Sequence, residues 1–108
     1  SSLTVRGDLD IATAPAFAAA VEAALAAVPH SLVVDLAPTT FLDSSGARQL
    51  ARAARSARTA GVPMHVVCPR TNGPVRLPID LLDLRSVVPI VDSVAEIVVG
   101  GSERDTRP

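Results

Sequence analysis

The feature that most constrains this fold is a buried-type strand that leads, through a short loop, into the start of a helix. Residues 32–36 read Leu-Val-Val-Asp-Leu, and Asp-Ser-Ser-Gly follows at residues 43–46. Asp and Ser oxygens accept hydrogen bonds from the N–H groups of a first helical turn, which have no partner within the helix. Residues 44–60 then repeat small apolar side chains at helical spacing. The pattern predicts an amphipathic helix capped at Asp43 and ended by Gly61.

Strand-like and helix-like segments alternate along the rest of the chain. We expect strands at residues 3–7, 32–36, 64–68 and 87–91, and helices at residues 14–27, 44–60, 74–83 and 93–99. Residues 37–42 are expected to form a loop, and Pro78 is expected to shorten its helix to a start near Val75 or Leu77. This order predicts an α/β fold with a mostly parallel four-stranded sheet in sequential order and helices mainly on one face.

Polar residues within the predicted strands indicate how the sheet is covered. Thr4, Arg6, Asp35 and His65 fall on the phase opposite the most apolar positions of their strands. One face of the sheet is therefore expected to be fully packed and the other only partly packed.

Length and composition limit the classes of protein to which this chain can belong. Its 108 residues suffice for one small domain, expected at residues 1–99, followed by a flexible tail at residues 100–108. No apolar run approaches the roughly 20 residues of a membrane span, and no secretory signal is expected. A net charge of −1 and 2% aromatic residues argue against nucleic-acid binding. The single cysteine, Cys68, cannot form an internal disulfide and fits a reducing cytoplasm.

Residues that usually carry catalysis or bind metals are few and scattered. All ten basic residues are Arg, so no Lys is available for a Schiff base or a phosphate-binding loop. His30 and His65 are isolated in the sequence, and no metal-ligand spacing occurs. Ser45 lacks the flanking glycines of a strained nucleophile turn. We therefore predict a protein that is not an enzyme and has no cofactor, with Cys68 as a core residue.

Three acidic residues are expected to meet at one end of the sheet. Asp8, Asp10 and Asp43 each follow a strand or a loop that leads to the carboxyl ends of the strands, where sites in open α/β sheets lie. Two interpretations stay open for them: ligands of Mg²⁺, or helix caps and solvated acids. We favour the second and predict no metal site.

The hydroxyls of Ser44 and Ser45 lie where an anion is stabilised. The free N–H groups and the dipole of a helix N-terminus favour negative charge, so a phosphoryl group on either serine meets a favourable field. The alternative is that the Asp-Ser-Ser-Gly element is only a cap and a turn, which spacing alone favours. Residue chemistry does not choose between the two serines.

The order of these elements resembles a known family. Phe-Leu-Asp-Ser-Ser-Gly at residues 41–46 follows Val-Val-Asp-Leu at residues 33–36, with Gly-Asp-Leu-Asp upstream at residues 7–10. The arrangement resembles the STAS domain of bacterial anti-sigma factor antagonists and implies a STAS-like (SpoIIAA-like) fold over most of the chain. That family usually has one further strand before the position of Leu3, so the resemblance implies a shorter or exposed edge there.

The resemblance also implies a function and a site. In the family the second serine of this element accepts phosphate, which falls on Ser45 here. The unphosphorylated form is expected to bind an anti-sigma factor that is a histidine-kinase-like ATPase and serine kinase, and so to free a sigma factor for transcription. Phosphorylation by that partner is expected to abolish binding, and a PP2C-type phosphatase to reset the switch. The expected partner-binding residues are Asp8, Asp10, Asp43, Ser44, Gly46 and Arg48.

Other uses of the same fold stay open. STAS-like domains also serve as constitutive subunits of lipid-transport ABC complexes and in anion transporters, where Ser45 would be only a cap. A nucleotide-binding role is a third alternative, for which the sequence offers no phosphate loop. Arg48 either neutralises a phosphate on Ser45 or is simply solvated. Together, Arg48, Arg52 and Arg55 either face an acidic partner surface or are ordinary solvent-facing charges.

Overall fold

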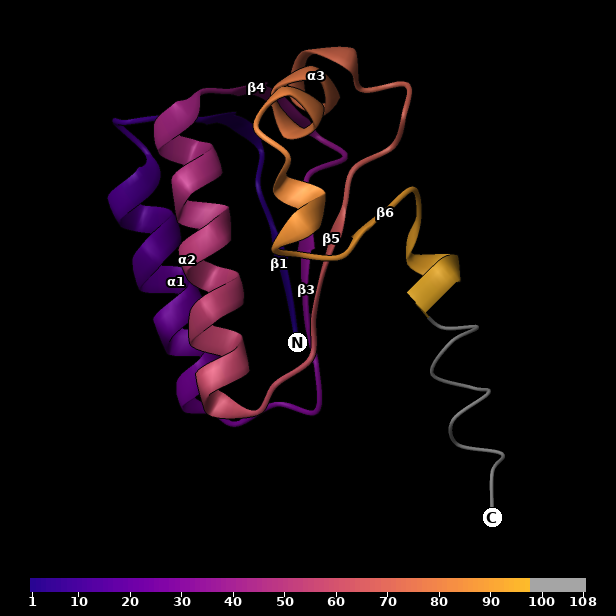
Figure 1. Cartoon of the computed structure of the whole chain (residues 1–108). Coiled ribbons are helices and arrows are strands. Elements are labelled where there is room, and N and C mark those ends of the chain that lie inside the picture. The colour runs from indigo at the N-terminus through magenta and orange to yellow at the C-terminus, as the bar shows by residue number, and fades with distance from the viewer. Residues whose placement is uncertain (98–108) are drawn as a thin grey trace.

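A computed structural model describes residues 1–97 of the chain (Figure 1). The strands are β1 (Ser2–Thr4), β2 (Gly7–Leu9), β3 (Leu32–Asp35), β4 (Thr39–Leu42), β5 (Met64–Val67) and β6 (Ile90–Val91). The helices are α1 (Ala14–Ala26), α2 (Ser44–Ala60) and α3 (Gly73–Leu81), and a 3₁₀ turn, η1, spans Leu84–Ser86. Residues 94–97 are also helical, whereas the end of the predicted last helix and the predicted tail lie outside the described residues.

Four parallel strands form the main sheet in the predicted sequential order. The order is β1-β3-β5-β6, and every neighbouring pair is parallel. Val33 of β3, for example, pairs with Ser2 on one side and with His65 on the other. α1 and α2 lie together on one face of this sheet, and α3 lies near the carboxyl ends of the strands (Figure 1). The predicted α/β architecture is confirmed.

The start of the chain and the segment before α2 differ from the prediction. Two strands replace the single strand expected at residues 3–7, because Gly7 adopts a left-handed conformation (φ 80°) where the chain leaves the main sheet. β2 then pairs in parallel with β4, which occupies most of the loop expected at residues 37–42. Pro38 lies just before β4, so it removes no ladder hydrogen bond from that strand.

The third helix also differs from the prediction. α3 begins at Gly73 and continues through Pro78, rather than starting near Val75 or Leu77. Pro78 is the sixth of the nine residues of α3, and the one helical hydrogen bond that it cannot donate is the bond to the Pro74 carbonyl in the first turn. The helix therefore tolerates the proline without breaking.

The last strand is shorter than predicted. β6 covers only Ile90–Val91 instead of residues 87–91, because the preceding positions follow η1 and contain Pro89. Beyond β6, the Glu96 carboxylate accepts hydrogen bonds from the backbone N–H groups of Asp92 and Ser93, which caps the helical residues 94–97.

The hydrophobic core lies between the main sheet and the layer formed by α1 and α2. Val34 of β3 and Leu50 of α2 are among its fully buried side chains. At the strand positions that alternate with these core positions, Thr4 is exposed, and Asp35 and His65 are half-buried, as the sequence predicts. Within the described part of the chain, no helix has the length and apolar character needed to cross a membrane.

Candidate functional site

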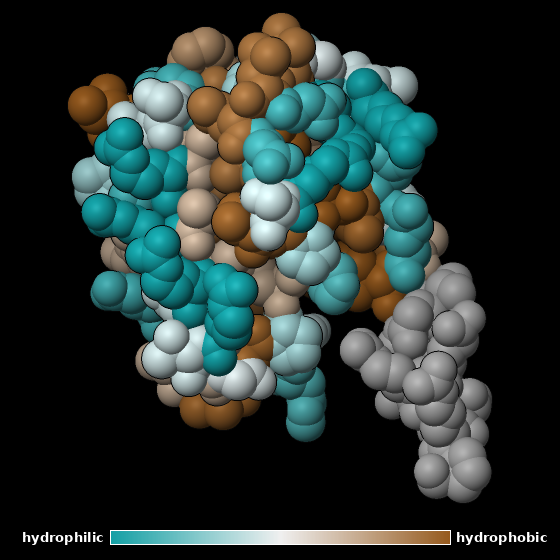
Figure 2. Space-filling model, viewed as in Figure 1, coloured by the Kyte–Doolittle hydropathy of each residue, from teal (hydrophilic) through white to brown (hydrophobic). Residues whose placement is uncertain are grey.

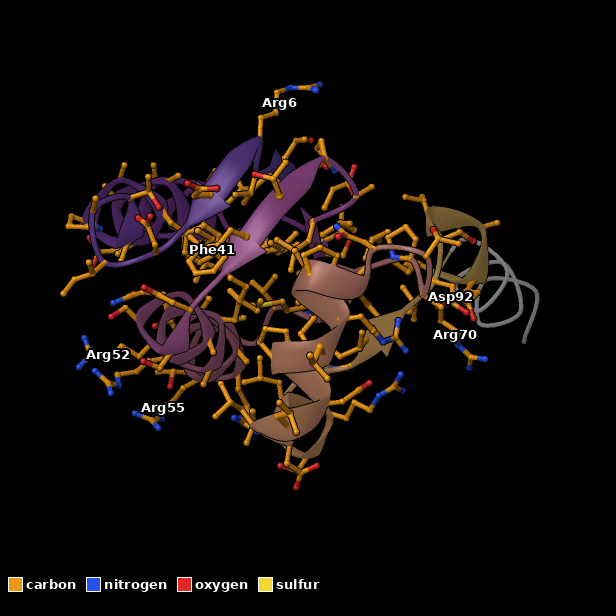
Figure 3. The ribbon with its side chains drawn as sticks, turned by 90° about the horizontal axis from the view of Figure 1, so that it is seen from above. Arg6, Phe41, Arg52, Arg55, Arg70 and Asp92 are labelled. Carbon is orange, nitrogen blue, oxygen red and sulfur yellow. The ribbon has the colours of Figure 1, made fainter. Side chains whose placement is uncertain are left out.

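Two paired strands bring the predicted site residues to one end of the molecule. β2 and β4 are parallel, so their carboxyl ends share an edge, and the Asp43 N–H bonds to the Leu9 carbonyl (3.4 Å). β2 leads into the turn at residues 10–13 before α1, and β4 leads into α2. Figure 3 shows this end from above, with the helix starts beside the two strands. The turn that holds Asp10 therefore lies next to Asp43.

Asp43 joins the starts of two helices. Its Oδ1 accepts a hydrogen bond from the Gly46 N–H (2.8 Å), which makes it the N-cap of α2. Its Oδ2 accepts a longer bond from the Ile11 N–H (3.3 Å) in the turn before α1. The prediction that Asp43 caps the helix is confirmed, and the same carboxylate also fixes the neighbouring turn.

Asp8 and Asp10 also accept hydrogen bonds at this corner. Asp10 Oδ1 accepts bonds from the N–H groups of Ala12 and Thr13 (3.0 and 3.1 Å), which closes the turn before α1. Asp8 Oδ1 accepts a bond from the Thr40 hydroxyl (3.0 Å) across the β2–β4 pair. Within residues 1–97, no group of three or more His, Cys, Asp or Glu side chains is placed to hold a metal ion.

Gly46 is the point at which α2 touches β2. A Cβ atom at this position would lie 2.2 Å from the Leu9 carbonyl oxygen and 2.8 Å from Leu42 Cδ1. Gly46 is buried, so it positions the serine-bearing turn rather than presenting a side chain. Sequence reasoning missed this packing role. The available signal was the glycine itself, because glycine is unfavourable within a helix and its presence in the first turn of α2 indicates a close contact.

Ser44 and Ser45 have different surroundings. Ser44 is exposed, whereas Ser45 is half-buried and lines an open groove of about 260 Å³ between the starts of α1 and α2. Pro15 lines the α1 side of this groove, and Arg48 and Arg52 line the α2 side. Neither serine hydroxyl forms a hydrogen bond with another residue of the described chain. Ser45 thus presents an unengaged hydroxyl at a helix N-terminus, in a groove that also contains guanidinium groups.

Two exposed apolar side chains near the acidic residues were missed by sequence reasoning. Ile11 is 75% exposed and Phe41 is 47% exposed, whereas the adjacent Leu42 is buried. Figure 3 shows the Phe41 ring beside β4 at this end of the molecule. The signal was that Ile11 lies in a polar turn and Phe41 immediately precedes a core leucine. Exposed apolar side chains of this kind are candidate contacts for a protein partner.

Cys68 lies away from this corner and is a core residue, as predicted. Its side chain is fully buried, and its Sγ lies 3.9 Å from the Pro69 carbonyl oxygen. Burial raises the pKa of the thiol above its usual value, although the nearby Arg76 guanidinium opposes this effect. A protonated, inaccessible thiol is a poor nucleophile.

Comparisons with known proteins agree with this geometry. The family model of the STAS domain matches residues 2–97. The structure of an anti-sigma factor antagonist from Mycobacterium paratuberculosis is 28% identical, with a TM-score of 0.76, and the match covers 92% of this chain and 82% of that one. A search of curated proteins finds no match.

Two more distant structures are similar in fold. A putative anti-sigma factor antagonist from Thermotoga maritima is 22% identical, with a TM-score of 0.81 and coverage of 92% of this chain and 84% of that one. The anti-sigma factor antagonist SpoIIAA in its unphosphorylated form is 14% identical, with a TM-score of 0.67 and coverage of 94% and 87%. Since the family model spans nearly all the described residues, the chain belongs to the STAS domain family.

Proposed function

We propose that this protein is a bacterial, cytoplasmic anti-sigma factor antagonist that works by partner switching and is itself not an enzyme. The 28% identical antagonist from Mycobacterium paratuberculosis supports the general role. The observation that carries the proposal is the placement of Ser45, whose unengaged hydroxyl lines an open groove at the start of α2. The acidic residues and exposed apolar side chains around it supply a surface for a protein partner.

The proposed partner is an anti-sigma factor with a histidine-kinase-like ATPase fold. The unphosphorylated antagonist binds it through the corner that contains Asp8, Asp10, Asp43, Ser44 and Arg48, and thereby frees the sigma factor for transcription. Within the complex the partner transfers a phosphoryl group from ATP to Ser45. The Ser45 Oγ forms the new bond to the γ-phosphorus, ADP leaves, and the hydroxyl proton is released. A PP2C-type phosphatase hydrolyses the phosphoserine and resets the switch.

Phosphorylation of Ser45 acts on the interface rather than on the fold. A phosphoryl group adds a charge of about −1.5 to −2, which a helix N-terminus tolerates well. The same group occupies part of the groove of about 260 Å³ and places negative charge in it. A coupling of about 1–3 kcal/mol between phosphate and partner is enough for a 5- to 150-fold change in affinity.

The experiment that tests this proposal maps the phosphate directly. The chain is incubated with ATP and the purified anti-sigma kinase from its source genome, and the modified residue is located by mass spectrometry. We expect phosphate on Ser45 in the wild type and in Ser44→Ala, and none in Ser45→Ala. Phosphate on Ser44 contradicts the assignment. Stable binding without any phosphorylation supports the alternative of a constitutive STAS subunit, such as one in a lipid-transport ABC complex.

A further inference from the structure

One helix of the domain carries an unbalanced row of positive charge. α2 contains four arginines and no acidic residue. Three of them, Arg48, Arg52 and Arg55, are exposed on the side of the helix that faces away from the core, and Figure 3 shows Arg52 and Arg55 pointing outward. Figure 2 shows hydrophilic side chains gathered over this outer surface. We call these three residues the arginine row.

The arginine row lacks the acidic partners that most other arginines of the described chain possess. Arg70 pairs with Asp92 (3.3 Å), and Arg85 pairs with Asp80 (3.5 Å). No residue of the arginine row forms an ion pair with any residue between positions 1 and 97. Like charges three and four positions apart on a helix repel one another, so this arrangement is unfavourable for the isolated domain.

The arginine row is continuous with the groove that contains Ser45. Arg48 and Arg52 line that groove, and Arg52 also lines a smaller one of about 130 Å³ between α1 and α2. Glu22 is the one acidic residue that lines the smaller groove. From Arg48 to Arg55 the row extends over about 10 Å along the helix axis, since each residue adds about 1.5 Å. Arg48 thus lies about one helical turn after Ser45, and the other two arginines of the row lie further along α2.

We propose that the arginine row is a docking surface for an acidic segment of the anti-sigma factor. This inference rests on the proposed function and adds the chemistry of the partner surface. Exposed, unpaired guanidinium groups are complementary to carboxylates, with which arginine forms bidentate hydrogen bonds. A phosphate on Ser45 lies beside Arg48 and Arg52 and neutralises part of this positive charge. Phosphorylation therefore weakens the attraction for the acidic segment in addition to obstructing the groove.

A protein segment fits this surface better than a nucleic acid or a membrane does. The row is about 10 Å long, shorter than the contact a polyanion makes with an extended basic face. The net charge of −1 provides no long-range attraction for one either.

The test measures association with the same purified anti-sigma factor by stopped-flow fluorescence. The row variant is Arg48→Gln, Arg52→Gln, Arg55→Gln. The matched control is Arg6→Gln, Arg70→Gln, Arg85→Gln, which removes the same charge elsewhere on the surface. We expect the row variant to associate at least about tenfold more slowly at low salt and to lose most of the salt dependence of the rate. The control should associate nearly as fast as the wild type.

Three results would overturn the inference, and one of them also tests the proposed function. Equal association rates for the row variant and the control contradict the docking surface and remove Arg48 from the binding corner, while leaving the phosphorylation switch at Ser45 intact. Failure of the wild type to bind the anti-sigma factor contradicts both. Binding of the wild type, but not of the row variant, to phosphatidylglycerol vesicles or to a 20-base-pair DNA duplex assigns the surface to a different ligand. Circular dichroism checks folding, and Arg52→Gln alone, expected to give a smaller loss, covers the case of an unfolded triple variant.

Discussion

Replacing Gly46 by alanine tests how tightly the serine-bearing turn is held against β2. The new Cβ atom would lie 2.2 Å from the Leu9 carbonyl oxygen, and real Cβ contacts stay above 3.0 Å, so α2 and β2 must separate by about 0.8 Å. Overpacking a well-packed interior costs about 1–3 kcal/mol. The separation also lengthens the bond from the Gly46 N–H to Asp43, and a lost N-cap costs a further 0.5–2 kcal/mol or so.

These terms predict that Gly46→Ala lowers the free energy of unfolding by about 1.5–5 kcal/mol. Since each kcal/mol lowers the Tm of a domain of this size by about 4–8 °C, the Tm should fall by at least about 6 °C. The matched control is Gly73→Ala at the start of α3, where an added Cβ meets nothing within 4 Å. That variant should be unchanged or slightly stabilised. Equal Tm values for the two variants in differential scanning calorimetry would refute the close approach of α2 to β2.

The other two predictions concern Asp43 and Cys68. Asp43→Ala loses two hydrogen bonds and should lower the free energy of unfolding, measured by urea denaturation, by about 1–3 kcal/mol. Asp43→Asn keeps one acceptor oxygen and should lose less than half as much. Equal losses for the two variants would show that the charge of Asp43, and not its capping hydrogen bond, stabilises the fold. Burial raises the pKa of the Cys68 thiol, so less thiolate forms at a given pH. Iodoacetamide should therefore label Cys68 at pH 8 far more slowly in the native protein than in the urea-unfolded protein. Comparable labelling rates would place Cys68 at the surface.

Much of this fold follows from local signals in the sequence. The signals for α2 all lie within or next to the helix itself. Asp43 marks its start, the small apolar residues mark its buried face, and Gly61 marks its end, so all three are predictable. Sequential parallel strands follow from the alternation of strand and helix patterns. The exposed arginine row also follows from helical spacing alone.

The remaining features depend on contacts between distant segments. β4 exists because Thr39–Leu42 pairs with β2, about thirty residues earlier, and both segments are too short for an alternating pattern to be clear. The role of Gly46 depends on the position of the Leu9 carbonyl, and the second bond of Asp43 depends on Ile11. The groove at Ser45 arises only when α1 and α2 lie side by side. Periodicity within a segment carries none of this information.

The measurement that tests the central claim most directly is the affinity of one antagonist preparation for the anti-sigma factor before and after phosphorylation. Isothermal titration calorimetry is performed on the unmodified chain and on the same chain carrying one phosphate, located on Ser45 by mass spectrometry. We predict that the unmodified chain binds, that Ser45→Ala binds equally well in the presence of ATP, and that the phosphorylated chain binds about 5- to 150-fold more weakly. Equal affinities of the phosphorylated and unmodified chains would contradict the partner switch.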